Sequence, residues 1–184
     1  MKIKIPVYKP SINGNEKKYV NECLESTWIS SKGKFLNKFE LEFSKYMGVK
    51  YSSSVSNGTV AIHLALKALD LGQGDEIIVP SFTYIASVNA IDYIGANPVF
   101  VDSREDTWNL DVNEVEKKIS QKTKAVLAVH LYGAACDMDK LLILCKKHNI
   151  YLIEDTAEAF GSKYNNRCLG TFGDISTFSF FGNK

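Results

Sequence analysis

Short apolar runs alternate along the chain with longer segments in which apolar residues recur every three or four positions. The short runs are rich in Val, Ile, Tyr and Phe and predict β-strands, whereas the longer segments predict amphipathic helices. This alternation is typical of an α/β domain with a mostly parallel sheet flanked by helices. Several runs are nearly continuous in apolar residues, which indicates strands that are covered on both faces.

The predicted elements begin near the N-terminus and continue to the end of the chain. Strands are expected at residues 51–55, 76–79, 98–101, 125–130, 151–154 and 175–180. Helices are expected at residues 58–69, 84–94, 112–119 and 138–148, after an amphipathic helix near residues 15–24. Asp111 stands in the cap position of helix 112–119 with Glu114 three residues later, a pattern typical of a helix N-terminus. Segment 28–33 is polar and turn-like, and we expect it at the surface or over a binding site.

Composition and charge exclude some classes of partner. The chain has 184 residues, a length typical of about one domain, and 45% of them are apolar, which is enough to form a buried core. Its 22 basic and 21 acidic residues are mixed without a long single-sign run, so we expect neither nucleic acid nor a membrane as partner. No apolar stretch is long enough for a signal peptide or a membrane span, so a cytoplasmic protein is expected. The four cysteines (Cys23, Cys136, Cys145 and Cys168) form no CxxC pair, which predicts buried free thiols and no metal site.

An anion-binding site is predicted at Ser56-Asn57-Gly58-Thr59. This segment follows an expected strand and opens an expected helix, so free backbone N–H groups and the positive end of the helix dipole converge there. It is neither a Walker loop nor a GxGxxG turn, because it has one glycine and no Gly-Lys-Ser/Thr. Plain capping of the helix by Ser56 or Asn57 would explain the same residues equally well.

Two charged residues stand at the ends of expected strands. Asp155 follows strand 151–154, at the carboxyl edge where open parallel sheets bind their ligands, and Lys184 follows the last strand. A pyridoxal phosphate (PLP) enzyme needs such a pair, since the amine forms a Schiff base with the cofactor aldehyde and the carboxylate keeps the pyridine nitrogen protonated. Helix capping alone would also explain Asp155. The convergence of the anion site, the carboxylate and the lysine on one sheet edge favours cofactor binding.

Other residues at this edge have two interpretations each. Tyr84, which follows strand 76–79 and Pro80, offers a ring that could stack on a flat heterocycle or pack in the core. The Ser179 hydroxyl could reach a phosphate or bond its own backbone. Among the histidines only His130 is placed to line a cleft, and we do not expect it to be catalytic.

Five segments in order resemble the successive signatures of the DegT/DnrJ/StrS sugar aminotransferases, which are fold-type-I PLP enzymes acting on nucleotide-linked keto sugars. The segments are VSNGT at 55–59, PSFTY at 80–84, HLYG at 130–133, EDTAEAFG at 154–161 and FSFFGNK at 178–184. The resemblance covers the whole chain in order, and five motifs at compatible spacing are far more specific than any one motif.

The resemblance implies a set of cofactor-contacting residues, namely Asn57, Gly58, Thr59, Tyr84, Asp155, Glu158, Ser179 and Lys184. Lys184 would hold PLP and serve as general acid and base, and Asp155 would pair with the pyridinium nitrogen. The amides of Gly58 and Thr59 with the Ser179 hydroxyl would hold the phosphate. Tyr84 would stack on the ring, and Glu158 would lie beside the ring hydroxyl.

The resemblance also implies a reaction and its partners. An amino group, usually from glutamate, would pass to the C4 ketone of a nucleotide-linked 4-keto-6-deoxyhexose, for surface polysaccharide such as O antigen. The FSFFGNK ending and Glu158 look most like the branch that acts on a GDP-linked sugar. Amination at C3 and dehydration by the same fold stay open, although dehydrating relatives typically carry histidine in place of the lysine. A homodimer whose partners complete each other's site is expected.

Family members continue for about as many residues again. The resemblance therefore implies an N-terminal helix and substrate-side segment at 1–34, followed by a PLP-binding large domain at 35–184. That large domain is expected to stop before the C-terminal small domain of the fold. An inactive fragment is a third interpretation of the chain.

Overall fold

The computed structural model describes residues 8–182, which divide into two compact units. The larger unit spans Val55–Ser179, and the smaller unit combines the chain up to Ser54 with the segment that begins at Phe180. The larger unit contains the whole of the sheet described next.

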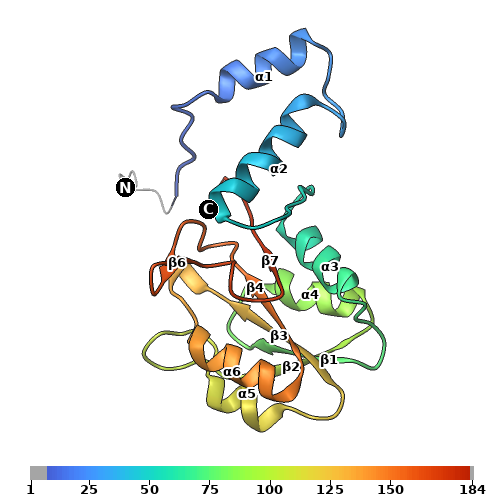
Figure 1. Cartoon of the computed structure of the whole chain (residues 1–184), viewed down its shortest axis with the longest axis vertical. Coiled ribbons are helices and arrows are strands. Elements are labelled where there is room, and N and C mark those ends of the chain that lie inside the picture. The colour runs from blue at the N-terminus through green and yellow to red at the C-terminus, as the bar shows by residue number, and fades with distance from the viewer. Residues whose placement is uncertain (1–7, 183–184) are drawn as a thin grey trace, which may run out of the picture. The chain divides into compact units, whose positions relative to one another are not determined.

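A five-stranded parallel sheet with the order β2-β1-β3-β4-β7 forms the centre of the larger unit (Figure 1). Its strands are β1 (Glu76–Pro80), β2 (Asn97–Val101), β3 (Thr123–Val129), β4 (Tyr151–Asp155) and β7 (Ile175–Thr177). A short antiparallel hairpin of β5 (Lys163–Tyr164) and β6 (Arg167–Cys168) precedes β7. The prediction of an α/β fold with a mostly parallel sheet is confirmed.

Helices cover both faces of this sheet (Figure 1). One face packs against α3 (Gly58–Ala68) and α4 (Ile85–Tyr93), and the other against α5 (Val112–Lys118) and α6 (Met138–His148). Strand side chains alternate between the faces, so Ile153 joins the α3 and α4 side while its neighbour Leu152 joins the α5 and α6 side. The same alternation sends Asp155 to the α3 and α4 side.

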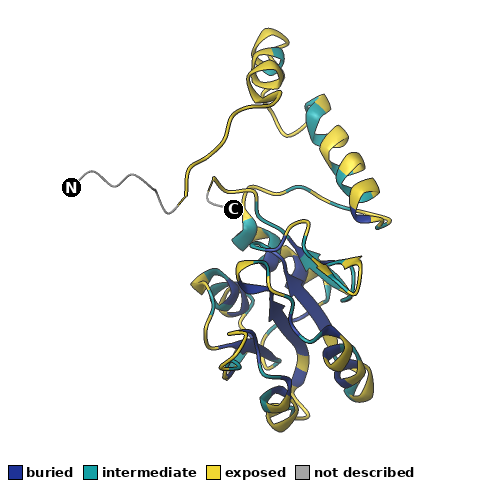
Figure 2. Ribbon diagram, turned by 90° about the vertical axis from the view of Figure 1, so that its left-hand side faces the viewer, coloured by how far each residue is buried: buried dark blue, intermediate teal, exposed yellow. Residues whose placement is uncertain are grey.

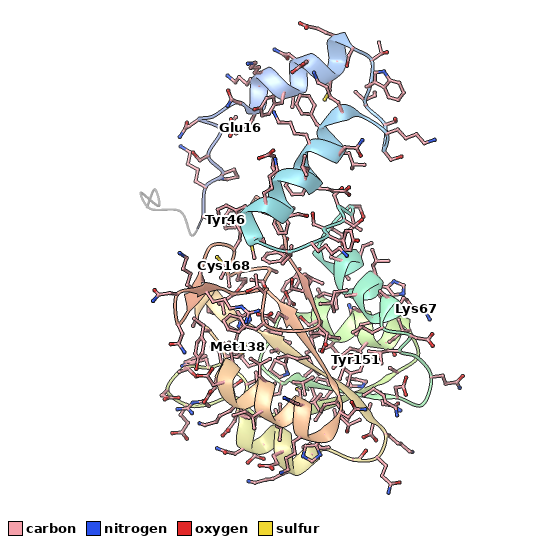
Figure 3. The ribbon with its side chains drawn as sticks, viewed as in Figure 1. Glu16, Tyr46, Lys67, Met138, Tyr151 and Cys168 are labelled. Atoms are coloured by element: carbon pink, nitrogen blue, oxygen red, sulfur yellow. The ribbon has the colours of Figure 1, made fainter. Side chains whose placement is uncertain are left out.

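Nearly every residue of the central strands is buried, which explains their continuous apolar runs (Figure 2). Each large side chain that folding removes from water contributes about 1.5–3 kcal/mol. The helices are buried on one side only: Met138 at the start of α6 is fully buried, whereas Lys67 on α3 is exposed (Figure 3). Asp111 caps α5 as predicted, because its side chain accepts the N–H of Asn113 at 2.8 Å.

The smaller unit contains two helices, α1 (Glu16–Glu25) and α2 (Lys34–Met47). Tyr19 of α1 packs on Phe35 of α2 with ring centroids 4.9 Å apart. Phe39 of α2 meets the ring of Phe180 edge-on at 5.6 Å. Helix α2 was not predicted, although its apolar positions have helical spacing and Gly48 ends it in the left-handed conformation, with φ of 67°.

Two predicted strands differ from the structure. Residues 51–55 form no strand. The Ser52 hydroxyl donates to the carbonyl of Glu40, and both the N–H and the hydroxyl of Ser54 donate to the Glu40 carboxylate. Serine bonds of this kind give the backbone an alternative to a sheet ladder. The last strand ends at Thr177 rather than at residue 180. Of the remaining predicted elements, each exists with ends within two residues of those expected.

The structure also tests the predictions that the cysteines are buried free thiols and that no segment spans a membrane. All four cysteines are free, but only Cys136 and Cys145 are buried, whereas Cys23 and Cys168 are partly exposed. Burial raises the pKa of the Cys136 and Cys145 thiols to about 12. Within residues 8–182, no helix has the length and apolar character needed to cross a bilayer.

Candidate functional site

The Asp155 carboxylate lies at the carboxyl end of β4, is 5% exposed, and accepts hydrogen bonds from its surroundings. The Ser87 hydroxyl donates to Oδ2 at 2.8 Å, and the Ala157 N–H donates to Oδ1 at 3.1 Å. Donors of this kind stabilise a charge that burial would otherwise disfavour. Residues 156–162 form turns, so Asp155 does not cap a following helix. The structure thereby removes the capping interpretation of this residue.

Ser87 is a site residue that sequence reasoning missed. It lies on α4, 1% exposed, and its partner Asp155 is 68 residues away in the chain. The Thr83 hydroxyl lies 3.4 Å from the Ser87 hydroxyl and extends the chain of polar groups toward the segment before α4. A serine inside an amphipathic helix gives no sequence signal of its own, because only the packing of α4 on the sheet brings it to β4.

The N-terminus of α3 forms the predicted anion site. The Asn57 side chain caps the helix by accepting the N–H of Val60 at 3.0 Å, and the N–H of Ala61 donates to the Asn57 carbonyl. Within the described part of the chain, the N–H groups of Gly58 and Thr59 are therefore among the donors left at this positive helix end. Capping and anion binding are thus compatible, since the cap uses other N–H groups.

Ser179 lies directly against this helix end. A Cβ built on Gly58 would be 3.2 Å from the Ser179 Cβ and 3.5 Å from its Oγ. The absence of a side chain at Gly58 is what lets the two segments approach so closely. We call Gly58, Thr59 and Ser179 the anion cradle, because two amides and a hydroxyl converge there.

Tyr84 and Glu158 flank the same edge. Tyr84 is 73% exposed at the residue before α4, so it does not pack in the core. The Glu158 carboxylate accepts the N–H of Tyr132 at 2.9 Å. Tyr132 has φ of 49° and is 81% exposed. Non-glycine residues with positive φ are uncommon and gather at functional sites.

His130 does not line a cleft, contrary to the expectation. Its side chain is fully buried, with Nε2 3.1 Å from a Glu154 oxygen and Nδ1 accepting the N–H of Cys136 at 3.2 Å. Alternation along β3 sends this side chain to the α5 and α6 side of the sheet, away from Asp155.

The strand register brings the predicted residues to one sheet edge. β4 pairs with β7 so that Asp155 is opposite Thr177, and the N–H of Thr156 donates to the Thr177 carbonyl at 2.8 Å. Ser179 follows two residues later, so the Asp155 carboxylate and the Ser179 member of the anion cradle lie near the ends of adjacent strands. Lys184 lies outside the described residues.

One buried hydroxyl at this edge lacks a partner. Among residues 8–182, the Thr156 Oγ1 is fully buried and makes no hydrogen bond. An unsatisfied buried polar atom beside a strand-end carboxylate is typical of a site that a ligand or a water completes. The edge therefore combines a held carboxylate, an anion cradle and an exposed aromatic ring, which suits a flat heterocycle bearing an anionic group.

A profile of the DegT/DnrJ/EryC1/StrS aminotransferase family matches residues 10–184. The GDP-perosamine synthases of Escherichia coli O157:H7 and Vibrio cholerae are 62% and 57% identical over 180 residues, which are 98% of this chain and 50% and 49% of theirs. The structure is similar to the PLP-form of a putative sugar aminotransferase, Spr1654 from Streptococcus pneumoniae, with a TM-score of 0.94 and 34% identity. That match covers 99% of this chain and 50% of the other. The chain thus spans about half the length of the curated relatives it matches.

Proposed function

Because the chain belongs to the DegT/DnrJ/EryC1/StrS aminotransferase family, we propose that it carries the cofactor-binding part of a PLP-dependent sugar aminotransferase. The observation that supports this most directly is the meeting of Asp155 with the anion cradle at one sheet edge. We further propose that residues 1–34 supply a substrate-side segment and that residues 35–184 form the cofactor-binding large domain.

The residues present fit PLP in the chemistry of their donors. The anion cradle offers two amides and a hydroxyl to a phosphate, at the positive end of an eleven-residue helix. Asp155 offers a carboxylate to a ring nitrogen, and Tyr84 offers an exposed ring that can cover one ring face. When bound, PLP supplies an aldehyde that takes up amino groups and a ring that accepts electrons.

In this proposal each residue has a defined task. Asp155, held by Ser87 and the Ala157 amide, keeps the proton on the pyridine nitrogen. Glu158, whose carboxylate accepts the Tyr132 N–H, would lie beside the ring hydroxyl. Asn57 orders the helix end whose Gly58 and Thr59 amides face the phosphate. Lys184 would anchor the cofactor covalently and would move the proton at the reacting carbon.

The substrates follow from the relatives and from the motifs. The similarity to two GDP-perosamine synthases supports a GDP-linked 4-keto-6-deoxyhexose as the acceptor, aminated at C4. We propose glutamate as the amino donor, surface polysaccharide such as O antigen as the destination of the product, and a cytoplasmic homodimer as the working form.

Covalent trapping tests the cofactor assignment. The purified chain is incubated with PLP, reduced with borohydride and weighed intact, with Lys184→Ala as the variant and Lys163→Ala, an exposed lysine of β5, as the matched control. We expect one reduced adduct in the wild type and in the control, and none in Lys184→Ala. An adduct that survives in Lys184→Ala would contradict the assignment of this lysine.

A substrate assay tests the reaction itself. With glutamate and a GDP-linked 4-keto-6-deoxyhexose, mass spectrometry is expected to detect a 4-amino sugar. A 3-deoxygenated sugar in its place would indicate a dehydratase, and an amino group at C3 would reassign the position of transfer.

A further inference from the structure

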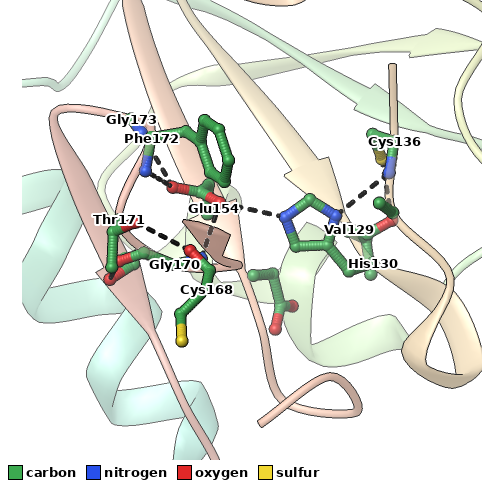
Figure 4. A network of polar contacts seen from close by, with 12 residues as sticks. Val129, His130, Cys136, Glu154, Cys168, Gly170, Thr171, Phe172 and Gly173 are labelled. Carbon is green, nitrogen blue, oxygen red and sulfur yellow. Dashed lines mark hydrogen bonds and ion pairs between the residues drawn. The ribbon is translucent and has the colours of Figure 1, made fainter. Parts of the chain in front are cut away.

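A buried polar network lies on the α5 and α6 side of the sheet, where the proposed reaction uses no residue (Figure 4). Its centre is Glu154, the next-to-last residue of β4, whose side chain is fully buried. The carboxylate accepts the backbone N–H groups of Gly170, Phe172 and Gly173, each at 2.7 Å. His130 Nε2 is the fourth group on it, at 3.1 Å.

Among the described residues, the four groups that hydrogen-bond to this carboxylate all act as donors. The Cys136 N–H donates to His130 Nδ1, so the imidazole proton is on Nε2 and points at Glu154. Burial by itself raises the pKa of the Glu154 carboxyl, but the hydrogen bonds from His130, Gly173 and Gly170 outweigh it and lower that pKa below its ordinary value. The residue is therefore ionised in the folded protein.

The loop that Glu154 holds leads into β7. Gly170 has φ of 84°, and a Cβ built on it would lie 2.3 Å from the Cζ of Phe178, so the Phe178 ring rests on the Gly170 backbone. The Ser176 hydroxyl donates to the Gly170 carbonyl at 2.7 Å. The position of Gly170 thus determines where the chain runs on both sides of Thr177, the last residue of β7.

Phe178 directly precedes Ser179, whose side chain contacts the Gly58 position of the anion cradle. A continuous set of contacts therefore connects the Glu154 carboxylate with the hydroxyl that we assign to the phosphate. This inference rests on the proposed function, in which the Ser179 hydroxyl binds the phosphate.

We propose that Glu154 and His130 are positioning residues for cofactor binding, which act by holding the Gly170–Gly173 loop and through it Ser179. Glu154 touches neither ring nor phosphate in this scheme. Glu154 instead holds β7 in the arrangement in which the Ser179 hydroxyl and the Gly58 amide would face the same phosphate. Its neighbour Asp155 serves the ring on the opposite face of the same strand.

Glu154→Gln tests the proposal, because it keeps the volume of the side chain and replaces one acceptor oxygen by a donor that faces N–H groups. Glu116→Gln on the exposed surface of α5 makes the same chemical change and serves as the matched control. Affinity is measured for PLP and for pyridoxal, which lacks the phosphate, by absorbance titration of each protein. His130→Gln is the second variant, since it removes the ring but keeps an N–H donor.

We expect Glu154→Gln to weaken PLP binding by roughly tenfold, the factor associated with one lost charge-assisted hydrogen bond, and to leave pyridoxal binding within about threefold. His130→Gln should act in the same direction by a smaller factor. An equal loss for both ligands, or unchanged PLP binding in a variant that only melts earlier, would overturn the positioning role.

Hydrogen exchange separates this proposal from the proposed function. If the wild-type chain binds neither PLP nor pyridoxal, the proposed function fails at this site. The rate of hydrogen exchange of the amides at residues 175–179 then tests the effect of the Glu154 network without a ligand. Faster exchange there in Glu154→Gln than in Glu116→Gln supports the connection between the loop and β7. Faster exchange confined to residues 170–173 would refute it.

Discussion

Gly58→Ala separates the stability of the fold from the chemistry of the anion cradle. The added Cβ would lie 3.2 Å from the Ser179 Cβ, where an unstrained contact between carbon atoms is about 3.5–4.0 Å, so Ser179 must move by a few tenths of an ångström. Gly58 is the first residue of α3 and its φ is not positive, so alanine fits the backbone. The expected damage is therefore confined to the position of the Ser179 side chain.

The two effects of this substitution have opposite signs. Replacing glycine by alanine restricts the unfolded chain and stabilises the fold by about 0.4–1 kcal/mol, less whatever the displaced Ser179 loses. A hydrogen bond to a charged group contributes about 1.5–3 kcal/mol, so displacing the Ser179 hydroxyl should weaken PLP binding roughly tenfold to a hundredfold. The melting temperature should thus stay near that of the wild type while affinity for PLP falls.

The assay is an absorbance titration with PLP and with pyridoxal, accompanied by a thermal melt. Gly72→Ala is the matched control, because its Cβ would meet only the Ile94 carbonyl oxygen at 3.7 Å, an ordinary contact. Pyridoxal should bind Gly58→Ala as it binds the wild type. PLP binding within about threefold of the wild type would refute the assignment of Gly58 and Ser179 to the phosphate.

Further expectations concern the carboxylates and the thiols. Ser87→Ala removes the donor to Asp155 Oδ2, so PLP and pyridoxal should both bind roughly fivefold to tenfold more weakly, and a loss restricted to PLP in the titration would contradict this. The pKa of the Glu154 carboxyl is lower in the folded protein than in the unfolded chain, so the unfolded chain binds more protons as the pH falls. The stability that the Glu154 charge contributes is therefore fully present above the ordinary pKa of 4.5. It is lost as the pH falls through the pKa of the folded protein. Urea unfolding at a series of pH values should show that fall in the wild type and a weaker one in Glu154→Gln, and equal slopes would argue against it. Cys136 and Cys145, with pKa values of about 12, should resist a chromogenic disulfide reagent at about pH 8 until the protein is denatured, and rapid labelling of either native thiol would contradict their burial.

The pattern of apolar residues by itself determined the fold class and most of the elements. Continuous apolar runs identify β1, β3 and β4, because strands covered on both faces need no polar positions. Local chemistry also placed the helix start at Asn57 and Gly58, since capping and open N–H groups depend on neighbours in sequence. The chemical roles assigned to these residues stay predictions.

Only the tertiary structure decided which of these residues meet. The contact of Ser87 with Asp155 joins residues 68 positions apart and depends on how α4 packs on the sheet. The failure of residues 51–55 to form a strand depends on Glu40, which offers its oxygen atoms to Ser52 and Ser54 and so replaces a sheet ladder. Hydrophobic periodicity reports which face of an element is buried, but it carries no information about which distant polar group a side chain will find there.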